Sequence, residues 1–114
     1  MVSFKELSDY IKEYIQLKAP GFYTLLDMAV FSRMRKHVEE AIFEDPVKVY
    51  RLLSNHYGNE DSALFVLTHF LIRPITIKLG KVDLEPELIK LATTDSSAFK
   101  EFISKLLLST SQNK

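Results

Sequence analysis

The sequence predicts an all-α fold, a single-domain bundle of five or six helices, and three observations favour this class. The chain has 114 residues, which is the length of one domain. It has only 3 Gly and 4 Pro, too few for the many turns of a β-sandwich or barrel. Apolar residues make up 46% of the chain and recur mostly at the helical spacings of three and four. We expect one domain over residues 1–108 and a frayed polar tail over 109–114.

The first helix is predicted over about 4–18. Ser3 and Glu6 have the S-x-x-E spacing of a capping box, in which each side chain bonds a free backbone N–H at the helix start. The apolar periodicity stops at Ala19-Pro20-Gly21, so the helix should end there.

A second, unbroken helix is predicted over about 23–43, where Thr24 and Asp27 repeat the spacing of a cap. Asp45 suits an N-cap and Pro46 a first helical position, so a third helix should begin there and end at Gly58. The second helix rests on one apolar stripe, formed by Phe22, Leu25, Leu26, Ala29, Val30, Met34, Val38, Ala41 and Ile42.

A fourth helix is predicted from about residue 61 to Gly80, with a kink at Pro74. Residues 74–79 alternate between apolar and polar types, so a short strand is the alternative. Because no second strand is evident to pair with it, we favour the kinked helix. A short fifth helix over about 85–93 and a sixth over about 96–108 complete the bundle.

The fourth helix is nearly all apolar, which is typical of a central helix surrounded by others. Its thin polar edge could reach solvent. Alternatively, it could line a cavity for a small molecule, with His69, Arg73 and Thr76 as the binding residues, or the excess apolar face could meet a second subunit. The polar or small residues of this edge are Ser62, His69, Arg73, Thr76 and Gly80.

Two basic clusters could bind a nucleic acid if the fold brought them together, because adjacent cations contact phosphates. The 15 basic and 15 acidic residues cancel, however, and no helix-turn-helix signature is present, so ordinary solvated surface is favoured. The residues that would make this contact are Arg33, Lys36, Arg73, Lys78 and Lys81.

Nothing in the sequence points to an enzyme, a cofactor or a metal, and we predict no catalytic residues. The chain has no Cys, no glycine-rich phosphate loop and no nucleophile elbow. His37, Glu40 and Glu44 could project from one helix, but the pattern lacks the second copy that a di-iron site needs. The acidic pairs Glu39-Glu40 and Glu85/Glu87 are interpreted as surface residues.

We expect the protein to be cytoplasmic and not to enter a membrane. The N-terminal segment lacks the basic and apolar regions of a signal peptide. The most apolar window, 63–79, is interrupted by His69, Arg73, Pro74 and Lys78 and is therefore a poor membrane span.

One segment carries a resemblance. Residues 45–53, DPVKVYRLL, followed by Tyr57-Gly58 and Ser62-Ala63, resemble a segment of small archaeal all-helical domains of unassigned function, some of which are thought to be output modules of sensory proteins. The similarity covers about 20 residues, differs at several positions and implies no catalytic residues. It implies a prokaryotic, archaeal regulatory module.

These observations together predict a non-enzymatic helical regulatory or protein-interaction domain. It could form a homodimer through the apolar surface of the second, fourth or sixth helix. The alternatives are a small-molecule sensor with a pocket near His69 and Arg73, and a nucleic-acid-binding regulator that uses both basic clusters.

Overall fold

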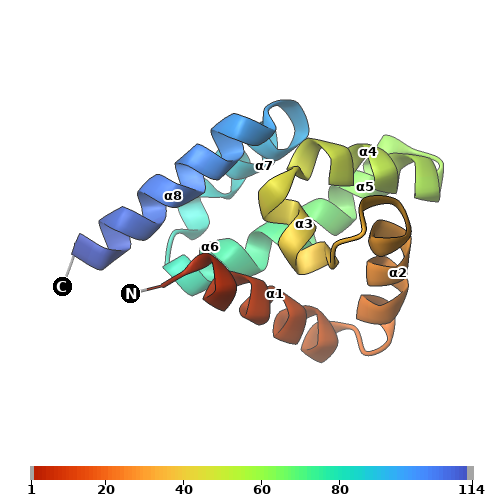
Figure 1. Cartoon of the computed structure of the whole chain (residues 1–114), viewed down its shortest axis with the longest axis horizontal. Helices are drawn as coiled ribbons and strands as arrows, with labels where there is room; N and C mark the ends of the chain where they lie inside the picture. The colour runs from red at the N-terminus through yellow and green to blue at the C-terminus, as the bar shows by residue number, and fades with distance from the viewer. Residues whose placement is uncertain (1, 113–114) are drawn as a thin grey trace.

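Helices form nearly all of the computed structural model, which describes residues 2–112 (Figure 1). Within that range there is no strand, so the fourth predicted helix is a helix throughout. The radius of gyration is 13.2 Å, close to the roughly 13 Å expected for one domain of this length. Counting 60–79 as one continuous helix, the described residues form seven helices rather than the predicted five or six.

The first helix follows the prediction, and the second does not. α1 spans Phe4–Lys18, and Ser3 Oγ accepts the backbone N–H of Glu6 at 3.1 Å. The predicted helix over 23–43 is two helices, α2 (Phe22–Met34) and α3 (Val38–Glu44). Between them the backbone of Arg35 has a φ of 58°, a left-handed conformation that ends α2.

Asp27 explains the break. Its Oδ1 accepts the backbone N–H of Val38 at 2.8 Å, and its Oδ2 lies 2.8 Å from Nδ1 of His37. Asp27 therefore caps α3, eleven residues further on, instead of the helix in which it lies. We call Asp27, His37 and Val38 the Asp27 clasp.

The predicted third helix, with Asp45 as its N-cap and Gly58 at its end, is confirmed as α4, Pro46–Tyr57. A 3₁₀ turn, η2 (Val82–Leu84), precedes α7 (Glu85–Thr94), and α8 covers Ser96–Gln112. α8 thus continues four residues past its predicted end, and residues 113–114 of the predicted tail lie outside the described range.

The starts of α4 and α8 are joined by Ser96. Its hydroxyl donates to Oδ1 of Asp45 at 2.7 Å and accepts the backbone N–H of Val47 at 3.1 Å. One side chain therefore satisfies a free N–H of α4 and holds the cap of that helix, so the two helix starts are fixed against each other.

Pro74 lies inside the long helix and does not end it. The helix consists of α5 (Glu60–Val66), a π-helical turn η1 (Leu67–Ile72) and α6 (Arg73–Leu79). Proline clashes with the carbonyl four residues before it, and the wider π turn relieves this: the N–H of Arg73 bonds the carbonyl of Thr68, five residues back. Gly80, with a φ of 68°, then ends the helix.

All helices contribute to one hydrophobic core. The long helix is only partly enclosed, since Leu64, Phe65 and Ile77 stay exposed. By length and composition alone, its 20 residues could cross a membrane, and 50% of its most apolar window is buried inside the protein, a pattern that soluble core helices share. Large fully buried side chains include Leu7, Ile11, Ile15, Leu26, Ile42, Leu53, Leu67, Leu71, Ile72, Ile75, Leu88 and Phe99.

Candidate functional site

The predicted ligand residues of the fourth helix are occupied by contacts within the protein. The guanidinium of Arg73 donates from Nε and Nη2 to the two oxygens of Glu85 at 3.1 and 2.8 Å, and from Nη1 to Nδ1 of His69 at 3.0 Å. This two-point ion pair raises the pKa of Arg73 and joins α6 to α7. Thr76 is fully buried, and its hydroxyl donates to the carbonyl of Arg73.

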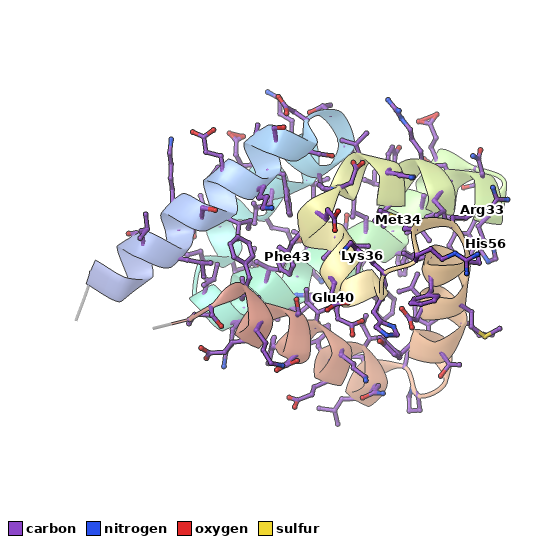
Figure 2. All side chains as sticks on the ribbon, viewed as in Figure 1. Arg33, Met34, Lys36, Glu40, Phe43 and His56 are labelled. Atoms are coloured by element: carbon purple, nitrogen blue, oxygen red, sulfur yellow. The ribbon has the colours of Figure 1, made fainter. Side chains whose placement is uncertain are left out.

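The predicted nucleic-acid residues do not form one patch. Lys36 pairs with Glu44 at 3.0 Å, and Lys78 lies over the ring of Tyr10, 5.5 Å from its centroid. Arg73 pairs with Glu85, and Lys81 follows α6. Arg33, on α2, is at the right end of the molecule in Figure 2, whereas α6 lies toward the left in the same view in Figure 1.

Glu39 is a buried residue and not the surface carboxylate that was predicted. Its side chain accepts the Tyr23 hydroxyl at 2.6 Å, and the residue is only 8% exposed. Burial, together with the adjacent carboxylate, raises the pKa of Tyr23 well above its usual range. The start of α3 after the Asp27 clasp points Glu39 inward, which an unbroken helix would not do. No group of three His, Asp or Glu side chains in the described range could hold a metal ion.

A groove of about 930 Å³ lies between α2 and α4. Its volume lies within the range of ligand sites in proteins. We call it the α2–α4 groove. Its apolar lining is Phe22, Leu25, Met28, Ala29, Leu52 and Tyr57, and its polar lining is Ser32, Arg33, Lys48, Arg51, Asn55 and His56.

Helical periodicity places these residues in the groove. On α2, positions 22, 25, 28–29 and 32–33 recur at three and four, so they share one face, which is apolar at the N-terminal end and ends at Arg33. On α4, positions 48, 51–52 and 55–56 recur in the same way. The packing of α2 on α4 brings the two faces together.

The groove has an uncompensated positive charge. No Asp or Glu lines it, and Arg33, Lys48 and Arg51 make no ion pair with any described residue. Figure 2 shows Arg33 and His56, which both line the groove, near one another at the right end of the molecule. Burial raises the pKa of Tyr57, so its phenol stays neutral. The groove can therefore attract negative charge.

Exposed apolar side chains accompany these cations. Leu25 is 66% exposed and Met28 63% exposed, although the sequence pattern assigned Leu25 to the buried stripe of the second helix. The buried face of α2 is formed by Tyr23, Leu26 and Val30, and helical spacing places Leu25 on the other side of the helix. Large apolar groups left in water beside unpaired cations are typical of a binding surface.

A second cavity, of about 700 Å³, adjoins the groove at the C-terminal end of α4 and shares Arg51 and Asn55 with it. Its lining is polar and includes Glu60, which accepts the hydroxyl of Tyr50 at 3.2 Å. The carboxylate of Glu60 offsets the charge of Arg51 there, so the second cavity has less net positive charge than the α2–α4 groove.

Sequence reasoning singled out Arg33 but missed Lys48, Arg51 and His56 as members of a site. The signal was present, because these three residues lie on one face of the predicted third helix with no acid among them. Comparison of the chain with protein-family models, curated proteins and solved structures finds no match.

Proposed function

We propose that this chain is a non-enzymatic protein-interaction domain, and that its docking surface is the α2–α4 groove. The occupant is a segment of a partner protein that carries carboxylates beside apolar side chains. The observation behind this proposal is the lining of the groove: Arg33, Lys48 and Arg51 have no acidic neighbour there, and exposed Leu25 and Met28 lie beside them.

A protein segment fits this lining better than a nucleic acid does. A phosphate backbone calls for many cations spread over a surface, and Lys36, Arg73 and Lys78 are engaged with Glu44, Glu85 and Tyr10. A sugar-phosphate chain has no apolar face to pack against the apolar half of the groove. An amphipathic helix has such a face and can cover it.

A homodimer is the second candidate, because Phe65 and Leu108 are each 58% exposed. Groove-to-groove pairing is disfavoured, since a two-fold axis would place two positive grooves against each other. The dimer would therefore use the apolar residues outside the groove. Light scattering at increasing concentration tests it, and a constant monomer mass would rule it out.

Peptide binding tests the docking proposal. The probe is a designed helical peptide with Glu and Leu on one face, titrated into the isotopically labelled protein while amide shifts are mapped. We expect shifts along α2 and α4, an affinity that falls with salt, and a loss of about ten-fold or more in Arg51→Glu. Lys100→Glu on α8 is the matched control, since Lys100 is exposed and outside the groove. Equal effects of the two variants would refute the proposal.

The remaining expectations from the sequence stay predictions. They are the cytoplasmic location, the regulatory role implied by the archaeal resemblance, and the small-molecule pocket near His69. The pocket is tested by a thermal-shift screen of metabolites against the wild type and His69→Ala.

A further inference from the structure

The apolar end of the α2–α4 groove continues onto the long helix. Phe22 lines the groove and packs against Phe70, with ring centroids 4.9 Å apart. Phe70 in turn lies 6.5 Å from Phe65, whose side chain is 58% exposed. These three rings, which we call the aromatic row, lead from the groove to an exposed anchor on α5.

Phe65 is held in its exposed position. Its ring packs on His69 at 4.4 Å, and His69 is fixed by Arg73, which is paired with Glu85. The ring is therefore supported from beneath while most of its surface faces water. A large aromatic side chain that is both fixed and exposed is the type of residue that dominates binding energy at interfaces.

The opposite end of the groove is cationic. Phe22 and Arg33 lie eleven residues apart on α2, which corresponds to roughly 16 Å along the helix axis. The groove thus changes from aromatic to positive along α2, over a length equal to about three turns of a bound helix. A ligand with the same chemistry at both ends would not match this change from aromatic to positive residues.

We infer that the partner segment is an amphipathic helix bound in one direction, with its acidic end at Arg33 and an apolar anchor at the aromatic row. This inference rests on the proposed function and specifies its ligand. Carboxylates at the acidic end would pair with the free guanidinium groups of Arg33 and Arg51, and a Leu or Phe at the other end would cover Phe65.

The test uses the designed helical peptide in two forms, with Glu at one end and Leu at the other, and with the order reversed. Each carries a spin label at either end, and the broadening of protein amide signals reports where that end lies. We expect the acidic end to broaden signals near Arg33 and the apolar end to broaden those near Phe65, in both forms of the peptide.

Two variants separate the contribution of the aromatic row to the affinity from that of the cationic end. Phe65→Ser should lower the affinity by about ten-fold at all salt concentrations, and Leu108→Ser is the matched control, because both side chains are 58% exposed. Arg33→Glu should lower it by a similar factor at low salt and much less at high salt.

The outcomes distinguish the two proposals. If no peptide shifts the signals of α2 and α4, the docking function itself fails. If peptides bind in the groove but each end broadens both regions equally, or Phe65→Ser behaves like Leu108→Ser, only the oriented helix is refuted. Tighter binding of duplex DNA than of the peptide at the same sites would also refute the oriented helix.

Discussion

Removal of the Asp27 carboxylate should destabilise the fold through the junction of α2 and α3. In Asp27→Ala, the buried N–H of Val38 loses its acceptor, and His37 loses its charged partner. Loss of a helix cap costs about 1 kcal/mol, with a range of roughly 0.5–2. The His37 side chain is 53% exposed, so solvent screens the second contact, and we assign it only about 0.5 kcal/mol.

The expected loss is therefore about 1.5 kcal/mol in the free energy of unfolding. Urea denaturation followed by circular dichroism measures it as a lower midpoint with an unchanged slope. Asp9→Ala is the matched control, because Asp9 pairs with Lys5 on the exposed surface of α1 and should cost under about 0.5 kcal/mol. Equal losses in the two variants would refute the role of the clasp.

The same variant should change the pH dependence of stability. Asp27, by hydrogen bonding and charge, raises the pKa of His37 above its ordinary 6.5. A raised histidine pKa adds stability that is fully present below the unfolded value of 6.5 and is lost as the pH rises through the folded value. The gap in stability between wild type and Asp27→Ala should thus narrow as the pH rises above about 6.5. A gap that widens with pH would contradict this sign.

Three further predictions concern stability and are checked by the same denaturation assay. Tyr23→Phe leaves the buried carboxylate of Glu39 without its phenol partner and should cost about 1–3 kcal/mol. Gly80→Ala meets open space but must keep a φ of 68°, so it should cost about 1 kcal/mol. Arg73→Lys replaces a two-point pair with Glu85 by a single contact and should cost about 1 kcal/mol, and no loss would show that the second hydrogen bond is dispensable.

The parts of the fold that depend on local chemistry could be predicted from the sequence. Ser3, Asp45 and Gly58 act within three or four residues of their position in the chain, so their roles follow from spacing alone. The same holds for Gly80, which ends the long helix at the predicted position. At each of these positions the backbone has few alternative conformations, and one residue determines where the helix begins or ends.

The errors arise where a side chain acts at a distance. Asp27 looks like a local cap, and only the folded chain brings it to Val38. The run Arg33–His37 continues the helical periodicity closely enough to conceal a break, although acids such as Glu39 and Glu40 are typical of the first turn of a helix. The predicted core position of Leu25 was wrong for a different reason, because the apolar stripe was drawn wider than the face that α2 buries.

The candidate groove could not be predicted, for a related reason. It depends on which faces of α2 and α4 meet, and periodicity identifies the faces of a helix but not its neighbour. The strongly apolar composition of the helix over 60–79 led to the prediction of a ligand site on its polar edge. The residues of that edge, His69, Arg73 and Thr76, instead bind one another and Glu85. The cations that line the groove without an ion pair to any described residue lie instead on α2 and α4.

The bond from Ser96 to Asp45 has a consequence for the order in which the protein acquires its structure during synthesis. Both walls of the groove are complete once residue 57 has been made. The start of α4 is not secured, and the core lacks Phe99 and Ile103, until α8 has been added. During translation, at roughly 5–20 residues per second, the residues of both groove walls therefore precede those of α8 by a few seconds, and the core stays incomplete over that time. In that interval the protein should depend most on chaperones, because the apolar side chains of the unfinished core are exposed to water.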